Sequence, residues 1–153
     1  MEPDSSPSLP GAVLFACNFN RVRSPMAAAL LRRLLGDRVF VDSCGLREDE
    51  GPDDEGANPF AEAVMGEIGC DLSRHTPKTF DDLEDGSFDL IISLTPEAQH
   101  TAVEFTRHRA TQIEYWPTFD PTLVDGSREA RLAAYREVRD DLAARIKERF
   151  GHG

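Results

Sequence analysis

Cys17 and Arg23 lie six positions apart in the segment 17–25, which reads CNFNRVRSP. An apolar run precedes this segment, and an alanine- and leucine-rich run follows Ser24 and Pro25, which favour the start of a helix. The backbone N–H groups of a loop that ends at a helix N-terminus can surround a tetrahedral oxyanion. Such a loop favours the nucleophilic thiolate of Cys17, and Arg23 can donate two hydrogen bonds to phosphoryl oxygens. The segment therefore indicates phosphoryl transfer to a cysteine whose sulfur Ser24 can hydrogen-bond.

A phosphoryl-transfer nucleophile also needs an acid that protonates the departing oxygen, and Asp120 is the candidate. It follows a short strand pattern in the segment 116–121, WPTFDP. Loops after parallel strands lie at one edge of the sheet, so we expect Asp120 near Cys17. Each feature alone is weak, because most Asp-Pro pairs are turns and free cysteines are commonly buried apolar residues. Their joint occurrence after predicted strands favours a catalytic pair.

Alternating strand and helix patterns are predicted to position these residues. Short apolar runs predict strands over residues 12–16 and 88–94, and two further strands are expected over 39–43 and 112–116. Helical spacing predicts helices from residue 24, over 58–69 and over 95–106, and a last helix whose apolar stripe runs from Leu132 to Phe150. Such alternation is typical of an α/β fold with a parallel sheet covered on both faces, whose ligands bind at the carboxyl ends of the strands.

The chain has 153 residues, a formal net charge of −11 and 40% hydrophobic residues, which fits one globular domain. We expect residues 1–11 to be a flexible tail and 12–150 to form the domain. No apolar run is long enough for a membrane span, no secretory signal pattern is present, and the negative charge disfavours nucleic acid as a partner. Three cysteines indicate a reducing, cytoplasmic compartment and no disulfide scaffold. The acidic segment 48–55 is expected to be a solvated loop.

The Cys-x5-Arg-Ser-Pro loop after the first strand, with Asp-Pro after the fourth, resembles the low-molecular-weight protein tyrosine phosphatases and their arsenate reductase relatives. The resemblance extends over about residues 12–150 and implies a three-layer sandwich, in which helices flank a four-stranded parallel sheet with flavodoxin-like winding. It also implies an enzyme without metal or cofactor. In that enzyme Cys17 forms a phosphocysteine, Arg23 binds the phosphoryl group, and Asp120 acts first as acid and then as base. The implied phosphate-binding loop contains Asn18, Phe19, Asn20, Arg21, Val22 and Ser24.

The resemblance further implies a hydrogen-bond network that holds this loop in shape. Asn20 and Ser24 correspond to its loop members, Ser43 to a serine that ends the second strand, and His75 to the family's histidine. Taken alone, His75 would be interpreted as a capping or surface residue, and the presence of the whole set favours the functional interpretation.

Several positions depart from the family pattern, whose loop usually reads Cys-x-Gly-Asn-x-Cys-Arg. Phe19 replaces the glycine, and it would strain the backbone if that position required a positive φ, or it could form a wall of the pocket. Arg21 adds a positive charge near the mouth, and Val22 replaces the second cysteine, which removes a disulfide partner for the nucleophile. The segment 122–126 lacks the tyrosines that line the family's aryl pocket, so a phosphotyrosine substrate is less secure than phosphatase chemistry.

Three alternatives remain open from the sequence. Arsenate reduction needs resolving thiols, and the segment after the third strand has none, while Cys44 and Cys70 are expected to be packed thiols. A phosphatase for phosphoarginine is the second alternative, and a phosphate-binding module without turnover is the third. The expected partner is a phosphorylated protein or a small phosphomonoester, and the expected state is a monomer or weak dimer.

Overall fold

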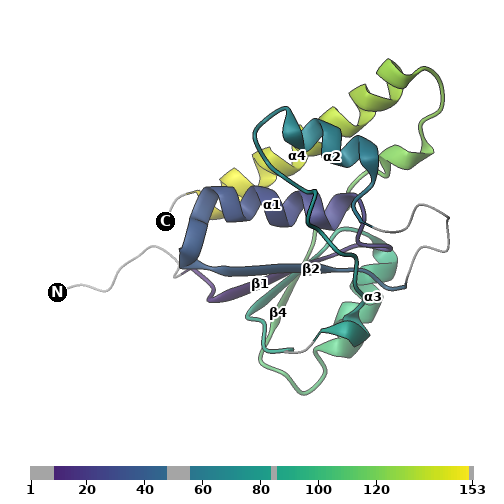
Figure 1. Cartoon of the computed structure of the whole chain (residues 1–153). Coiled ribbons are helices and arrows are strands. Elements are labelled where there is room, and N and C mark those ends of the chain that lie inside the picture. The colour runs from purple at the N-terminus through teal and green to yellow at the C-terminus, as the bar shows by residue number, and fades with distance from the viewer. Residues whose placement is uncertain (1–8, 48–55, 84–85, 152–153) are drawn as a thin grey trace.

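The computed structural model describes residues 9–47, 56–83 and 86–151. Four parallel strands form one sheet in the order β2-β1-β3-β4 (Figure 1). The strands are β1 (Ala12–Ala16), β2 (Phe40–Cys44), β3 (Leu90–Ser93) and β4 (Gln112–Tyr115). This is the doubly wound order of flavodoxin-like folds, so the predicted α/β class and parallel sheet are confirmed. Residues 1–8 of the predicted tail 1–11 and the acidic segment 48–55 lie outside the described residues. At the end of the predicted tail, Leu9 packs against the core and the carbonyl of Gly11 accepts from the N–H of Phe40.

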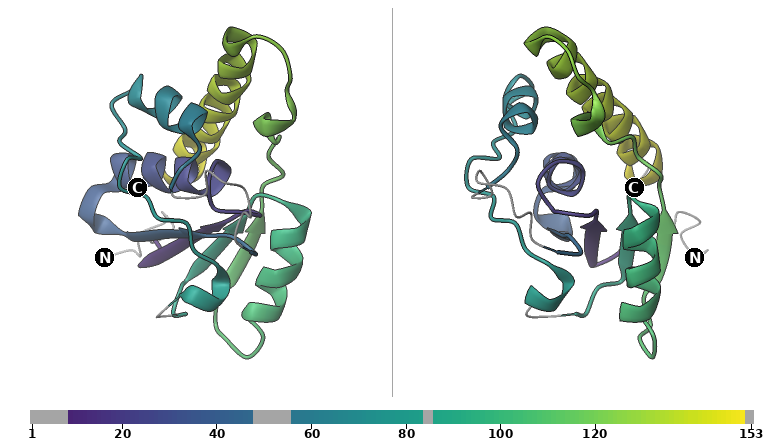
Figure 2. Two further views of the ribbon diagram at one scale, coloured as in Figure 1. Left: turned by 45° about the vertical axis from the view of Figure 1, so that its right-hand side comes forward. Right: turned by 90° about the vertical axis from the view of Figure 1, so that its right-hand side faces the viewer.

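Helices cover both faces of the sheet, as a three-layer sandwich requires (Figure 2). Helices α1 (Arg23–Leu35), α2 (Pro59–Gly66) and α4 (Arg128–Phe150) lie on one face, and α3 (Pro96–Phe105) lies on the other. Alternate residues of β1 point to opposite faces: Val13 and Phe15 pack in the core beneath α1 and α4, and Leu14 and Ala16 pack against α3. The apolar runs of β1 and β3 exist because these two central strands are buried on both sides, whereas the edge strand β4 is partly exposed along its length.

The apolar stripe of the last helix is confirmed, since all six of its residues are buried. They are Leu132, Tyr135, Val138, Leu142, Ile146 and Phe150. The helix begins before the stripe, at Arg128, where the Ser127 hydroxyl accepts a hydrogen bond from the N–H of Ala130. Among the described residues, no helix is both long and apolar enough to cross a membrane.

The structure corrects several element boundaries by one to a few residues. Helix α1 begins at Arg23 after Val22, so Ser24 is not its N-cap, because its hydroxyl bonds the sulfur of Cys17 instead. Helix α2 ends at Gly66 rather than at residue 69, and the chain turns through Gly69 with φ of 82°. The predicted strand over 88–94 is shorter, the one over 39–43 is shifted by one residue, and 3₁₀ turns at 36–38, 80–82 and 121–123 were not predicted.

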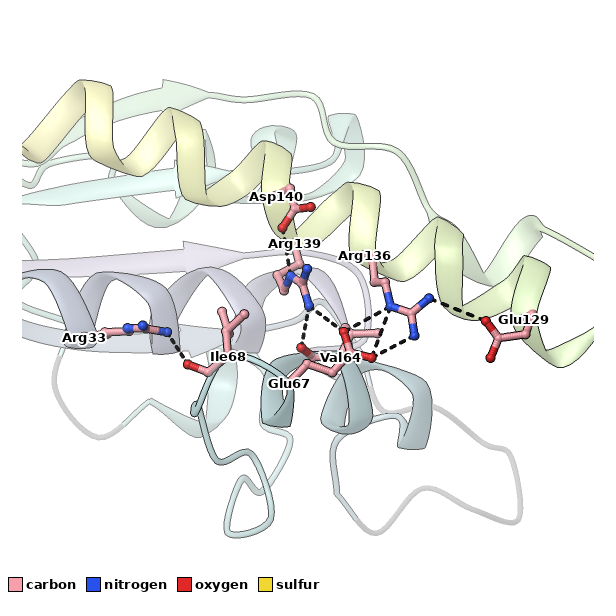
Figure 3. Close-up of polar contacts among 8 residues, drawn as sticks. All are labelled: Arg33, Val64, Glu67, Ile68, Glu129, Arg136, Arg139 and Asp140. Atoms are coloured by element: carbon pink, nitrogen blue, oxygen red, sulfur yellow. Dashed lines mark hydrogen bonds and ion pairs between the residues drawn. The ribbon is translucent and has the colours of Figure 1, made fainter.

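Salt bridges connect Glu67, at the end of α2, with α4 (Figure 3). The carboxylate of Glu67 accepts hydrogen bonds from Arg136 and Arg139, and Arg139 also donates to the carbonyl of Val64 at 2.8 Å. The two arginines lower the pKa of Glu67 from 4.5 to about 2, chiefly through these hydrogen bonds. The network fixes the last turn of α2, the helix whose N-cap residue, Asn58, borders the site described next.

Candidate active site

The loop that carries Cys17 begins where β1 ends and closes on the first turn of α1. The N–H of Cys17 donates to the carbonyl of Cys44 at 3.1 Å, which continues the β1–β2 ladder by one residue. At the same edge of the sheet, the N–H of Thr118 donates to the carbonyl of Leu94 at 3.1 Å. Thr118 lies two residues before Asp120. The parallel strands thus bring two distant segments together at their carboxyl ends, as the sequence pattern predicted.

The loop turns sharply at Asn20, which has φ of 58°. Asparagine tolerates this left-handed region better than most residues, and Phe19 is not among the residues with positive φ, so the strain considered for Phe19 does not arise. Gly45 lies directly beneath the turn. A Cβ at Gly45 would come within 2.8 Å of the backbone of Asn18, Phe19 and Asn20, so only glycine fits there.

The side-chain amide of Asn20 is fully buried and uses both of its N–H groups. They donate to the hydroxyl of Ser24 at 2.8 Å and to the hydroxyl of Ser43 at 2.9 Å. The amide oxygen accepts from the backbone N–H of Lys78 at 3.0 Å, which fixes which end of the amide is oxygen. Asn20 therefore joins the loop to the end of β2 and to the segment before residue 80.

Ser24 connects this network to the sulfur of Cys17. Its hydroxyl lies 2.9 Å from Sγ and 3.3 Å from the carbonyl of Cys44, and its backbone N–H donates to Sγ at 3.4 Å. Because Asn20 already donates to this hydroxyl, the one hydroxyl proton is left for an acceptor, and the nearer acceptor is the sulfur. The arrangement stabilises negative charge on Cys17.

His75 contacts the backbone of the same turn. Its Nε2 lies 2.7 Å from the carbonyl oxygen of Asn20, so Nε2 carries a proton and donates it. Burial lowers the pKa of His75 below the ordinary 6.5, and the hydrogen bond to Asn20 opposes that shift. The imidazole is therefore neutral at neutral pH and acts as a fixed donor.

Arg23 and Asp120 meet at the opposite side of the loop. The buried guanidinium of Arg23 donates from Nη1 to the carbonyl of Thr118 at 3.0 Å, and Nη2 lies 3.7 Å from a carboxylate oxygen of Asp120. The other oxygen of Asp120 accepts from the backbone N–H and the hydroxyl of Thr122, at 3.0 and 2.6 Å. Asp120 is thus held at the pocket with one oxygen directed away from the Thr122 contacts.

These groups surround a pocket of about 270 Å³. Cys17 lies at the pocket together with Phe19, Arg21 and Val22 of the loop. Arg23, Asn58, Asp120 and Thr122 complete the lining. A nucleophilic sulfur, a guanidinium and a carboxylic acid facing one small space is an arrangement suited to phosphoryl transfer through a covalent intermediate. Among the described residues, no group of three His, Cys, Asp or Glu side chains could hold a metal ion.

The thiols of the other two cysteines do not line this pocket. Cys44 is fully buried among the side chains that face α3, whereas Cys17 packs in the core on the α1 face. Burial, followed by the nearby Cys17, raises the pKa of the Cys44 thiol far above its usual range. Cys70 is 7% exposed and packs after α2. Both are packed thiols, as the sequence predicted.

Every residue proposed from the sequence lies in or beside this loop, and the sequence reasoning missed three others: Gly45, Asn58 and Thr122. The glycine after the second predicted strand was a visible signal for a close backbone approach. Asn58 precedes a proline at the start of a predicted helix, and its oxygen accepts from the N–H of Phe60 as an N-cap. Neither signal showed that Gly45 lies against the loop backbone or that Asn58 lines the pocket.

Comparison with known proteins gives one family. Residues 12–150 match the profile of the family described as low molecular weight phosphotyrosine protein phosphatase. An arsenate reductase of Bacillus subtilis is 31% identical over 136 residues, covering 89% of this chain and 92% of that protein. An arsenate reductase of Halalkalibacterium halodurans is 33% identical over 135 residues, covering 88% and 91% of the two chains.

Solved structures with the same fold include tyrosine phosphatases and an arginine phosphatase. The Erwinia amylovora tyrosine phosphatase amsI superimposes with a TM-score of 0.74 at 20% identity, covering 92% of this chain and 91% of its own. The low molecular weight protein tyrosine phosphatase of T. tengcongensis gives 0.73 at 25% identity, with 92% and 97% covered. The arginine phosphatase YwlE gives 0.69 at 23% identity, with 90% and 91% covered.

Proposed function

Because this chain belongs to the low molecular weight phosphotyrosine protein phosphatase family, we propose that it hydrolyses phosphate monoesters through a phosphocysteine on Cys17. The observation that carries the proposal is the chain of hydrogen bonds from Asn20 through Ser24 to the Cys17 sulfur, with Arg23 and Asp120 at the same pocket. Each group has a separate role in the two steps.

In the first step, the Cys17 thiolate attacks phosphorus, the S–P bond forms and the ester P–O bond breaks. The departing oxygen takes a proton from Asp120, so the product leaves as a neutral alcohol or phenol. Arg23 and the loop N–H groups bind the three equatorial oxygens, where charge develops in the transition state. The buried position of Arg23 supports this role, because a guanidinium held in place needs little reorganisation when the phosphoryl group binds.

In the second step, Asp120 takes a proton from water as that water attacks phosphorus. The S–P bond breaks, inorganic phosphate forms and Cys17 returns to thiolate. Here sulfur is the leaving group, and the Ser24 hydroxyl 2.9 Å from it is positioned to stabilise the charge that it acquires. The proton that Asp120 gains restores it as the acid for the next cycle.

Steady-state hydrolysis of p-nitrophenyl phosphate in EDTA, from about pH 5 to 8, tests this function. We expect turnover by the wild type, loss of activity in Cys17→Ser, and a kcat at least about 100-fold lower in Asp120→Asn, as removal of a general acid usually gives. Cys70→Ser and Asp125→Asn are the matched controls, because they change a buried thiol and an exposed carboxylate that do not line the pocket. Bound phosphate without turnover in the wild type would contradict the proposal and leave a phosphate-binding module.

The proposed substrate is a phosphorylated protein or a small phosphomonoester, used by a monomer or weak dimer in the cytoplasm. The pocket volume of about 270 Å³ supports a phosphorylated side chain or a small ester. The exposed ring of Phe19, 5.1 Å from the Arg47 guanidinium, supports an apolar wall at the mouth. Size-exclusion chromatography with light scattering tests the oligomeric state.

Arsenate reduction is the second candidate, because curated relatives more than 30% identical are arsenate reductases. Arsenate resembles phosphate and would form a Cys17 adduct in the same loop. Its reduction to arsenite takes two electrons, which two thiols supply as they become a disulfide. The chain has three cysteines, and the buried Cys44 and Cys70 are poor resolving thiols, so external thiols would have to supply the electrons.

Arsenate-dependent oxidation of a thiol such as glutathione or reduced thioredoxin tests the second candidate. Activity that persists in Cys44→Ala with Cys70→Ala would establish arsenate reduction by external thiols. Activity that disappears in this double variant would instead assign a resolving role to a buried thiol. No arsenate-dependent oxidation by the wild type would remove the candidate.

A further inference from the structure

The N-cap residue of α3, Thr95, contacts the loop that carries Cys17. Its hydroxyl lies 2.7 Å from Oδ1 of Asn18 and accepts a hydrogen bond from the N–H of Ala98 at 3.0 Å. Because Ala98 is the donor in the second contact, the one hydroxyl proton of Thr95 is donated to Asn18. Thr95 is 3% exposed, so water competes little for either bond. The hydroxyl therefore joins the first turn of α3 to the residue that follows the nucleophile.

The backbone of Asn18 is held on its other side by the segment after β2. Its carbonyl accepts from the N–H groups of Leu46 and Arg47, at 2.8 and 3.3 Å. In a trans peptide the carbonyl of one residue and the N–H of the next point in opposite directions, so the N–H of Phe19 is directed away from that segment. Phe19 lines the pocket. The peptide between Asn18 and Phe19 is thus held from two sides, by α3 and by the segment after β2.

The residue before Thr95 connects the same part of the chain to both loops of the site. The N–H of Leu94 donates to the carbonyl of Ala16 at 2.8 Å, and the carbonyl of Leu94 accepts from the N–H of Thr118 at 3.1 Å. The carbonyl of Thr118 in turn accepts from Arg23 at 3.0 Å. The start of α3 therefore lies between the loop that carries the sulfur and the loop that carries the acid, and it contacts both.

We propose that Thr95 is a positioning residue for phosphoryl binding: through Asn18 it holds the N–H of Phe19 in the orientation that a phosphoryl oxygen requires. The physical reason is that donors already oriented toward the anion need no reorganisation when it binds. Asn20 and Ser24 hold the later part of the loop, and Thr95 holds the part that leaves β1. This inference rests on the proposed phosphatase function and deepens it.

Binding of inorganic phosphate, measured by calorimetry, tests the inference without requiring turnover. Thr95→Val keeps the shape of the side chain and removes the hydroxyl, so phosphate should bind about two- to tenfold more weakly, the range that one neutral hydrogen bond gives. The kcat/KM for p-nitrophenyl phosphate should fall by a similar factor. Thr95→Ser keeps the hydroxyl and should bind phosphate as the wild type does.

Two further variants separate the contact with the loop from the stability of α3. Asn18→Leu removes the acceptor and leaves Thr95 as the N-cap, and it should weaken phosphate binding by the same factor. If the two side chains act through one hydrogen bond, the double variant should bind no more weakly than the weaker single variant. Thr106→Val is the matched control, because the buried Thr106 hydroxyl donates to the carbonyl of Ala102 at 2.9 Å at the other end of α3. It should leave phosphate affinity unchanged.

Wild-type phosphate affinity in Thr95→Val overturns the inference, because the hydroxyl would then serve only to cap α3. Additive losses in the double variant also overturn it, since the two side chains would then act independently. If Thr95→Val does not fold, Asn18→Leu decides alone, and wild-type affinity in that variant overturns the inference. Turnover by the wild type is measured separately: phosphate binding without turnover contradicts the phosphatase function and leaves the test of Thr95 intact, so the two failures are distinguishable.

Discussion

Replacing Ser24 by alanine removes the hydroxyl that lies 2.9 Å from the Cys17 sulfur. A hydrogen bond to a charged group contributes about 1.5–3 kcal/mol. The sulfur carries this charge when the phosphocysteine breaks down, so the second step should slow by about 10- to 150-fold. The first step should slow much less, because the same hydrogen bond also stabilises the thiolate before it attacks.

Rapid mixing with p-nitrophenyl phosphate resolves the two steps. We expect Ser24→Ala to give a burst of p-nitrophenol that approaches one per enzyme, followed by slow steady-state turnover. Ser93→Ala is the matched control, since Ser93 is also a fully buried serine at the carboxyl end of a strand and its hydroxyl has no hydrogen-bond partner in the described structure. It should show wild-type kinetics.

Wild-type steady-state turnover without a burst in Ser24→Ala would refute this reasoning. That outcome would mean that the hydroxyl proton is directed to the carbonyl of Cys44, 3.3 Å away, and not to the sulfur. A parallel loss of both steps would instead mean that the substitution disturbs the loop. A thermal melt of Ser24→Ala beside Ser93→Ala distinguishes a disturbed loop from a lost charge interaction.

Three further predictions follow from contacts around the loop. Gly45→Ala should abolish phosphate binding measured by calorimetry, because its Cβ would lie 2.8 Å from loop backbone atoms. Gly66→Ala is the control: a Cβ at Gly66 has no atom within 4 Å, so this variant should bind phosphate normally and melt no lower than the wild type. Glu67→Gln should lower the melting temperature at neutral pH. Because the pKa of Glu67 is depressed from 4.5 to about 2, this difference should shrink as the pH falls below 4.5 toward 2. Burial lowers the pKa of His75 in the folded protein below 6.5, so the unfolded chain binds more protons than the folded one just below that pH. The wild type should therefore lose stability as the pH falls below 6.5. His75→Gln should flatten this part of the plot of melting temperature against pH.

The order of strands and helices could be predicted from the sequence because the central strands β1 and β3 are buried on both faces and give apolar runs, between which the helical patterns stand out. Element ends were less predictable, since tertiary contacts decide them. Ser24 is a residue type that favours the N-cap position, yet its hydroxyl hydrogen-bonds the sulfur of Cys17 in the structure, and α1 begins at Arg23, one residue before Ser24. The apolar stripe of α4 was predictable because its spacing alone defines the buried face.

Some of the pocket residues could likewise be predicted from the order of the strands, and others depend on tertiary packing. Cys17, Arg23 and Asp120 could be proposed as site residues because they follow predicted parallel strands, and the carboxyl ends of parallel strands lie at the same edge of a sheet. Asn58 and Thr122 could not, because their place at the pocket depends on how α2 and the 3₁₀ turn at 121–123 pack. The network from Glu67 to α4 fixes that packing, and its members gave no pattern in the sequence beyond ordinary surface charge.

The loop keeps its shape although Phe19 and Val22 depart from the family pattern. The left-handed turn lies at Asn20, and the close approach beneath it falls on Gly45, so the backbone makes no demand for glycine at Phe19. The side chains of Phe19 and Arg21 both line the pocket, and Arg21 donates a hydrogen bond to the carbonyl of Gly56 at 2.9 Å. Loop geometry and pocket lining therefore depend on different residues in this chain: we expect substitution at Asn20 or Gly45 to change the shape of the loop, and substitution at Phe19 or Arg21 to change the lining of the pocket.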